Sequence, residues 1–287
     1  MPAERDDAIL PPPASGEESG LASASVRRKA ASHVVVALQI VTFLALMAAW
    51  QALSAAKILD PFFFSRPSDI ALRIWEWLSS GFIWEHLAVT LIEALLAFAL
   101  GTLFGVAFGL AFARVELLAA VFDPYIRIFN ALPRVILAPI FAVWFGLGVA
   151  SKVALGVTLV FFIVFFNVYQ GVKEVSPVVL ANARMLGASR RQLLRHVYVP
   201  SATSWMFSSL HTSVGLAFVG AVVGEYLGSS RGVGYLILQA EGTFDINTVM
   251  AGILVLTAFA LALDAAVGRI ERRLLRWQPA AAETEKL

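Results

Sequence analysis

Long apolar runs alternate with short polar segments along most of the chain. A helix needs about 20 apolar residues to cross the hydrocarbon core of a bilayer. Six stretches reach this length, and we expect spans at about residues 34–53, 86–112, two within 117–170, 201–223 and 248–267. The pattern therefore predicts an all-α membrane protein of about six transmembrane helices.

The two ends of the chain depart from this pattern. Residues 1–30 are rich in Pro, Ser, Ala and acidic residues without apolar periodicity, which predicts a disordered tail. We divide the rest into a first span with a following segment over 31–85, a membrane core over 86–277 and a short tail over 278–287. The first apolar run is longer than that of a signal peptide. We therefore expect an uncleaved span, although residues 53–56 resemble a cleavage site.

Proline and glycine mark special positions within the apolar runs. Pro133 and Pro139 fall inside the third expected span, which predicts a kinked or locally unwound helix there. Gly101, Gly105 and Gly109 recur every four residues in the second span, so they share one helix face. A face without side chains lets another backbone approach closely, and we expect a helix-packing surface there.

Lysine and arginine are distributed unequally between the two sides of the expected spans. Fifteen lie on one side and five on the other, while Arg127 and Arg134 are too close to the kinked span to assign. The larger group is Arg5, Arg27, Arg28, Lys29, Arg114, Lys173, Arg184, Arg190, Arg191, Arg195, Arg269, Arg272, Arg273, Arg276 and Lys286; the smaller is Lys57, Arg66, Arg73, Lys152 and Arg231. Cytoplasmic loops carry the excess of these residues. The distribution predicts that both termini and residues 173–200 are cytoplasmic.

Composition and missing motifs exclude several classes of protein. The chain is 59% hydrophobic and only 15% charged, whereas a soluble domain is about 25% charged. Its net charge of +2 is too small to indicate nucleic-acid binding, and it has no cysteine for disulfides or thiolate metal sites. No P-loop, HExxH helix or EF-hand pattern occurs. We expect neither a nucleotide site nor a metal site in this chain.

One short motif is misleading. Residues 228–232 satisfy G-x-S-x-G, the pattern of a nucleophile elbow. That site requires a strand before the serine, and an acid and a histidine after it in the chain. All four histidines precede the motif, so we interpret its glycines as a turn. No other nucleophile and base pair is present, and we expect a protein that is not an enzyme.

Several polar side chains lie within the expected spans, where an ionised group is costly to bury. Glu93 and Asp264 are expected near an interface, where a structural role is favoured over the alternative role in transport. A cation and an amide beside the Pro133 kink could instead face an anionic solute. The candidates for a translocation path are Asn130, Arg134, Asn167 and Glu225.

The longest polar interruption in the hydrophobic half of the chain covers residues 173–200. The dipeptide Ser176-Pro177 predicts the start of a helix, and Gly187 predicts its end. Ser189 predicts the cap of a second helix, and Pro200 is expected to interrupt its continuation. The segment therefore forms a helix, a glycine turn and a helix between two spans.

This segment resembles the EAA loop of ABC importer permeases. Ala181-Asn182-Ala183 is followed after three residues by Gly187, and after nine more by Val197-Tyr198-Val199-Pro200. The order is similar to the family pattern E-A-A-x3-G-x9-I-x-L-P. The resemblance extends over about residues 85–277, to permeases of the nitrate, sulfonate and taurine subclass. It implies the type I importer permease fold, of the MetI-like kind, with its permease core over 86–277.

The resemblance implies a coupling role for this segment. In the family, the helix before the glycine docks into a groove on a cytoplasmic ATPase subunit. A short protruding helix suits recognition by a groove. Ala181 stands where the family motif has glutamate, so any ion pair of that glutamate is missing here. The residues that carry the implied role are Ala181, Asn182, Ala183, Arg184, Gly187, Ala188, Arg190 and Arg191.

The resemblance also implies partners and a mechanism. The partners are two ATPase subunits that bind ATP, a second permease copy in a homodimer, an extracytoplasmic solute-binding protein and the lipid of a bacterial inner membrane. The implied function is alternating-access import of a small anion of the sulfonate, taurine or nitrate type, with no cofactor in this chain. The alternative function is a secondary transporter, which needs ion-coupling acids within the membrane.

Overall fold

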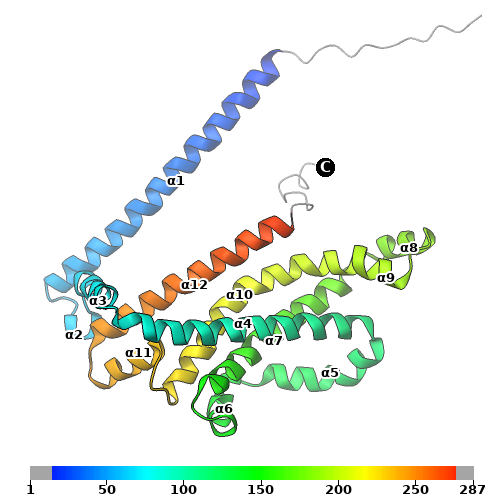
Figure 1. The fold of residues 1–287 in the computed structure, drawn as a ribbon. Coiled ribbons are helices and arrows are strands. Elements are labelled where there is room, and N and C mark those ends of the chain that lie inside the picture. Colours follow the sequence, from blue (N-terminus) through cyan, green and yellow to red (C-terminus); the bar gives the residue numbers. More distant parts are fainter. Residues whose placement is uncertain (1–14, 276–287) are drawn as a thin grey trace, which may run out of the picture. The chain divides into compact units, whose positions relative to one another are not determined.

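The computed structural model describes residues 15–275, and the side chains from residue 34 onward except that of residue 116. All its regular elements are helical (Figure 1), which confirms the predicted fold class. The chain divides between Pro67 and Ser68 into two compact units, earlier than the predicted boundary at residue 85. The reason is that helix α3 (Pro67–Ser80) packs with the second unit, where Arg73 pairs with Asp245 at 3.5 Å.

The first unit consists of α1 (Ser15–Ala55) and α2 (Pro61–Phe64). Residues Val34–Ala55 are long and apolar enough to cross a membrane, in agreement with the predicted first span. Disorder was expected through residue 30, but the helix already begins at Ser15. Residues 17–29 contain many good helix formers, and a nucleated helix extends at little free-energy cost. The predicted tails at 1–14 and 278–287 lie outside the described residues.

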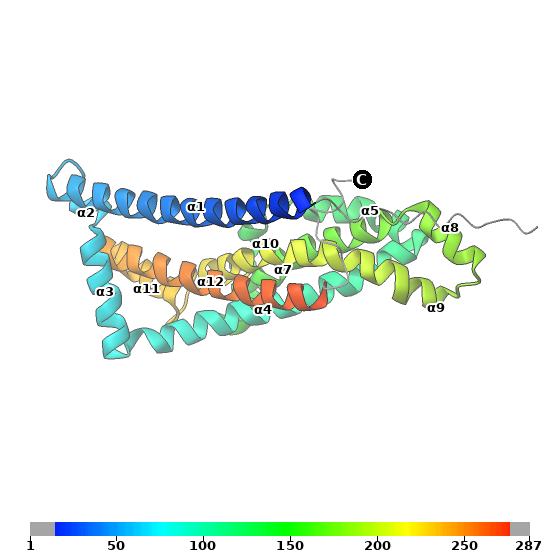
Figure 2. The same cartoon turned by 90° about the horizontal axis from the view of Figure 1, so that it is seen from above.

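The second unit contains the remaining helices, with α3 lying across the ends of α4 and α12 (Figure 2). Their bounds are α4 (Phe82–Arg114), α5 (Glu116–Ala131), η1 (Arg134–Leu137), α6 (Ala138–Phe145), α7 (Val149–Lys173), α8 (Pro177–Met185), α9 (Arg190–Leu193), η2 (Leu194–Tyr198), α10 (Val199–Tyr226), α11 (Val233–Gly242) and α12 (Ile246–Leu274).

Four stretches of this unit can cross a membrane as single helices: α4, α7, the continuous stretch from α9 to α10, and α12. A further candidate span is broken, because Leu117–Ala131 and Arg134–Phe145 meet at 86°. The break falls at Pro133, as predicted. Pro139 instead lies in the first turn of α6, where its missing N–H is tolerated. With the broken pair counted once, the described residues contain the six predicted spans.

The glycine face of α4 packs against α7, which confirms the predicted surface. A Cβ atom at Gly101 would lie 2.6 Å from the Cβ of Val160, and one at Gly105 would lie 2.7 Å from the Cβ of Val164. At Gly109 the nearest atom would be the Phe165 carbonyl oxygen, at 2.9 Å. The two backbones therefore approach as closely as only glycine permits.

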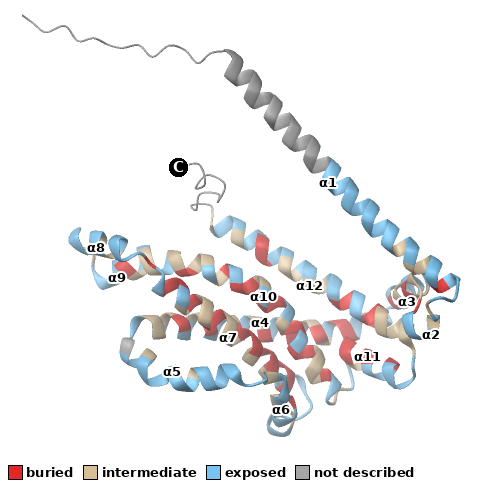
Figure 3. Ribbon diagram, turned by 180° about the vertical axis from the view of Figure 1, so that it is seen from behind, coloured by how far each residue is buried: buried red, intermediate tan, exposed pale blue. Residues whose placement is uncertain are grey.

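The helix α7 also touches α10 through small residues. A Cβ at Gly220 of α10 would lie 2.4 Å from the Cα of Gly156, and a Cβ at Gly156 would lie 2.5 Å from the Cβ of Ala97 in α4. Buried residues concentrate along α4, α7 and α10 (Figure 3). These three helices form the core that positions both ends of the second unit.

Candidate functional site

The coupling segment, residues 173–200, connects α7 to α10 and carries α8 and α9 at one end of the second unit (Figure 1). The helix α8 begins at Pro177, with Ser176 at the N-cap position, as predicted. The Ser176 side chain forms no capping hydrogen bond. Proline at the first helical position therefore sets the start of α8 through its fixed φ.

The turn after α8 is a Schellman motif built on Gly187. The N–H of Gly187 donates to the carbonyl of Arg184 at 2.9 Å, and the N–H of Ala188 donates to that of Ala183 at 3.0 Å. Gly187 has a φ of +79°, in the left-handed region that glycine adopts without strain. The predicted end of the helix is confirmed, and the turn fixes the direction in which α8 protrudes.

The second helix of the segment starts with a capping box and continues into the membrane. The Ser189 hydroxyl accepts from the N–H of Gln192 at 3.3 Å, while the Gln192 side chain accepts from the N–H of Ser189 at 2.8 Å. The predicted interruption at Pro200 was wrong. A π-helical turn precedes it, in which the N–H of Val199 donates to the carbonyl of Leu194. This turn accommodates the proline, so α9, η2 and α10 form one continuous helix.

The coupling segment presents an apolar tip beside a shallow groove. Met185 is 85% exposed and Leu186 88% exposed, although both are apolar. The groove has a volume of about 230 Å³ and is lined by Ala183, Leu186, Gly187, Ala188, Gln192, Leu193, His196 and Val197. Three predicted coupling residues thus line one surface. The other five, which are exposed, are Ala181, Asn182, Arg184, Arg190 and Arg191.

The structure brings two of the four translocation-path candidates together. A guanidinium N–H of Arg134 donates to the side-chain oxygen of Asn130 and, at 3.3 Å, to its backbone carbonyl. The guanidinium carbon lies 4.4 Å from the ring centroid of Phe162 in α7. Asn167 lies elsewhere and donates to the carbonyl of Ile163 at 2.9 Å. Glu225, the fourth candidate, is fully buried at the other end of α10 from the coupling segment.

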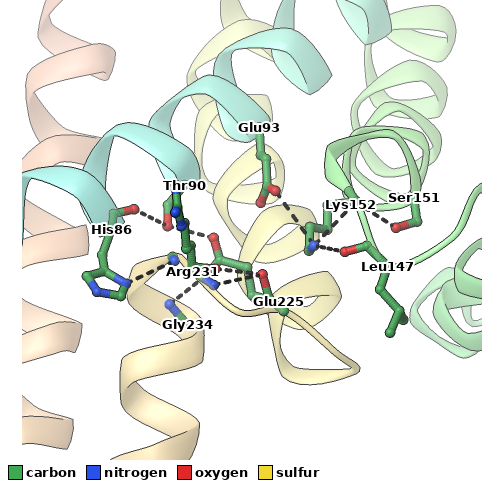
Figure 4. A network of polar contacts seen from close by, with 12 residues as sticks. His86, Thr90, Glu93, Leu147, Ser151, Lys152, Glu225, Arg231 and Gly234 are labelled. Atoms are coloured by element: carbon green, nitrogen blue, oxygen red, sulfur yellow. Dashed lines mark hydrogen bonds and ion pairs between the residues drawn. The ribbon is translucent and has the colours of Figure 1, made fainter.

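A buried polar network surrounds Glu225 at this far end of the second unit (Figure 4). One Glu225 oxygen accepts from the Thr90 hydroxyl at 2.6 Å, and the other accepts from the N–H of Gly234 at 2.5 Å. Thr90 in turn accepts from the N–H of Val233 at 2.8 Å, and His86 Nδ1 accepts from that of Gly232 at 3.2 Å. These contacts attach the start of α11 to α4 and α10.

Beside this network lies a buried ion pair between Lys152 and Glu93, a residue that was expected near an interface but is fully buried. Lys152 was counted only with the smaller group of basic residues outside the spans, but it belongs to the first turn of α7 and is 2% exposed. Its ammonium donates to the carbonyls of Leu147 at 2.6 Å and Gly148 at 3.2 Å, and lies 3.8 Å from a carboxylate oxygen of Glu93. Both Glu93 oxygens are buried and have no hydrogen-bond partner among the described residues. The only sequence signal for this pair was an ionisable residue inside an apolar run.

The G-x-S-x-G motif forms a turn, as interpreted from the sequence. Gly228 has a φ of +149° and Gly232 a φ of +114°. Of the described histidines near this region, His86 accepts from the N–H of Gly232, and His211 contacts Asp264 and Glu271. Neither is placed as a base for Ser230. The motif therefore belongs to the scaffold of the buried network.

A second polar tie connects α10 and α12 nearer the coupling segment. Nδ1 of His211 lies 2.5 Å from Asp264 and Nε2 lies 3.0 Å from Glu271. Asp264 thus links α12 to α10. This triad does not have the geometry of a metal site, and no such group occurs among the described residues.

These features define a class of protein: a helical membrane protein with a broken span, close helix packing and, between two spans, a short helix pair with an exposed apolar tip. Residues 101–276 match the family described as "Binding-protein-dependent transport system inner membrane component". The chain belongs to this family, and it is a permease subunit of a binding-protein-dependent ABC importer. The resemblance seen in the sequence is thereby confirmed.

The chain matches curated relatives over most of their length. The chain is 33% identical to the riboflavin transport system permease protein RibX of Chloroflexus aurantiacus, over 83% of this chain and 89% of that protein. It is 34% identical to the formylaminopyrimidine transport permease protein ThiX of Halalkalibacterium halodurans, over 82% and 94%. It is 28% identical to the taurine transport system permease protein TauC of Escherichia coli, over 84% and 90%.

Two solved structures share the fold. An amino acid ABC transporter matches with a TM-score of 0.54 and 19% identity, over 66% of this chain and 92% of that chain. The MetNI methionine ABC transporter matches with a TM-score of 0.52 and 21% identity, over 69% and 96%. The predicted type I importer permease architecture is confirmed.

Proposed function

We propose that a separate cytoplasmic ATPase drives this permease by docking on the coupling segment. The observation that carries this proposal is the exposed apolar tip of Met185 and Leu186, held in a fixed direction by the Schellman turn at Gly187. Exposed apolar side chains on a short helix are typical of a ligand for a groove. The excess of lysine and arginine on this side supports a cytoplasmic location for the segment and for both termini.

The continuous helix from Arg190 to Tyr226 supports mechanical coupling to the far end. It has 37 residues, which corresponds to about 55 Å at about 1.5 Å per residue. A displacement of the coupling segment therefore moves a rod that carries Glu225 in its last turn. The assembly contains two ATPase subunits, two copies of this permease and a solute-binding protein. ATP binding favours the outward-open state, since a ligand shifts an equilibrium only through its different affinity for the two states.

The transported solute is a small organic or inorganic anion of the sulfonate, taurine or nitrate type. Support comes from Arg134 at the broken span. It pairs with the neutral Asn130 and the ring of Phe162, and with no carboxylate among the described residues. Its charge is thus available to an anion at a place where irregular backbone is tolerated only against protein or a water-filled cavity. The relatives named above carry different solutes, so Arg134 is the residue to test.

The variant Arg134→Glu is expected to reduce uptake of the solute captured by the cognate binding protein at least tenfold, to about the level of liposomes without protein. The matched control is Arg127→Glu in the same broken span, because Arg127 is exposed and already paired with Asp123 at 2.8 Å. Initial uptake rates in proteoliposomes decide the matter. Equal rates for Arg134→Glu and the unchanged protein would remove Arg134 from the path.

A secondary transporter is the alternative function, and the buried Glu93 and Glu225 are the observation that favours it, because ion-coupled carriers use acids inside the membrane. A protonophore and a hydrolysis-deficient ATPase separate the two functions. We expect uptake to persist with the protonophore and to fall to background with the ATPase variant. Loss of uptake with the protonophore, together with normal uptake with the ATPase variant, would contradict the ATP-driven importer and favour a secondary transporter.

A further inference from the structure

The first turn of α11 is held by side chains from two other helices. Its leading N–H groups have no partner within the helix, and those of residues 232, 233 and 234 donate to His86, Thr90 and Glu225. The first two acceptors lie on α4 and the third on α10 (Figure 4). We call these three side chains and three N–H groups the latch. It joins α4, α10 and α11 at the far end.

Two glycines leave only enough room for the Glu225 carboxylate. A Cβ at Gly232 would lie 2.2 Å from the carboxyl carbon of Glu225, and one at Gly234 would lie 2.6 Å from a carboxylate oxygen. The turn therefore closes directly onto the carboxylate. Water is excluded from this contact, since Glu225, Thr90 and Val233 are all fully buried. Hydrogen bonds in such surroundings are strong because they do not compete with solvent.

The Glu93 carboxylate beside the latch opposes its closure. Glu93 follows Thr90 by one helical turn and is fully buried without a hydrogen bond. The nearby Lys152 donates to the carbonyls of Leu147 and Gly148, and its ammonium lies 3.8 Å from a Glu93 oxygen, beyond hydrogen-bond distance. A buried carboxylate with one ion pair at this distance has lost its hydration without gaining a hydrogen bond. Entry of water would restore that hydration.

We propose that Thr90 and Glu225 are positioning residues that keep the far end of the permease closed, and that the unsatisfied Glu93 keeps this closure reversible. The closed state gains the latch hydrogen bonds and the open state gains the hydration of Glu93 and Lys152. These opposing contributions bring the two states close in free energy, as a transport cycle requires. The inference rests on the proposed function only for the force that opens the latch, which is the movement of α10.

The absence of cysteine in the chain allows a direct test. Ser151→Cys places one thiol beside Lys152, at a side chain that is 6% exposed, with little change in size. The permease in lipid nanodiscs is treated with a water-soluble maleimide, and the labelling rate measures opening. Thr90→Val and Glu225→Gln are expected to raise this rate about tenfold or more, because each removes hydrogen bonds from the closed state only.

The variant Glu93→Gln is expected to shift the rate in the opposite direction. A neutral amide loses less hydration on burial than a carboxylate and can itself donate a hydrogen bond, so labelling should slow at least about threefold. Glu85→Gln is the control, since Glu85 lies on the same helix but is exposed and paired with Arg231 at 2.7 Å. It should change the rate by less than about twofold.

The opposite signs distinguish a latch from a purely structural network. If the network only held the fold together, all three variants would speed labelling and lower the melting temperature together. An unchanged or faster rate for Glu93→Gln, or an unchanged rate for both Thr90→Val and Glu225→Gln, would overturn the proposal. The isolated permease suffices for these measurements. Failure of the ATPase to dock on the coupling segment would therefore leave their outcome unaffected.

Discussion

The variant Gly105→Leu is expected to remove nearly all folded protein from the membrane. Even a methyl group at this position would lie 2.7 Å from the Cβ of Val164 and 3.0 Å from the backbone oxygen of Phe161. The second of these contacts is with backbone and cannot be relieved by a change of rotamer. Overpacking of this kind destabilises by about 1–3 kcal/mol for small additions, and the four carbons of leucine exceed that range.

The matched control is a glycine of another membrane helix. A Cβ at Gly215 in α10 would meet nothing within 4 Å, so Gly215→Leu adds the same atoms at an exposed position where the first of them has no neighbour. Folded yield by size-exclusion chromatography in detergent, and the melting temperature, should fall for Gly105→Leu and stay near the original for Gly215→Leu. Similar melting temperatures for the two variants would contradict the close packing of α4 and α7.

The spans and the coupling segment could be predicted because their signals are local. Gly101, Gly105 and Gly109 recur every four residues, so the sequence alone places them on one face of a helix. That face could be predicted without knowing that α7 packs on it. The helix start at Pro177 and end at Gly187 follow from the backbone preferences of single residues. Single glycines such as Gly156 and Gly220 carry no such signal. Their role depends on the register between two helices.

The buried network could not be predicted for a different reason. Thr90 and Val233 are 143 residues apart, and nothing in either neighbourhood indicates the other. Lys152 was misread because a lysine near the end of an apolar run resembles a loop residue. It can be buried because its ammonium binds the two carbonyls that precede α7. The continuous helix through Pro200 was missed because a π-helical turn leaves no mark in the local sequence.

The variant Gly187→Val is expected to weaken ATPase binding at least tenfold while the permease still inserts and folds. Gly187 has a φ of +79°, and a β-branched residue in this region is strained by more than about 1–2 kcal/mol. The turn will therefore adopt another conformation and redirect the apolar tip of Met185 and Leu186. Gly187→Pro should act more strongly, since it also removes the N–H that donates to Arg184.

The variant Gly187→Asn provides the matched control for this position. Asparagine tolerates positive φ, and a Cβ at Gly187 would meet nothing within 4 Å. It should therefore keep the Schellman turn and most of the affinity. Loss of binding with asparagine as well as valine would indicate that the ATPase contacts Gly187 itself rather than the surface that the turn orients.

The most direct test of the proposed coupling is the affinity of the purified permease in nanodiscs for the ATPase subunit of its transport system. The dissociation constant should be nearly the same for the original protein and Gly187→Asn, and at least about tenfold higher for Gly187→Val, with equal melting temperatures for all three. Unchanged affinity for Gly187→Val, or for Gly187→Pro, would show that the ATPase does not bind the coupling segment.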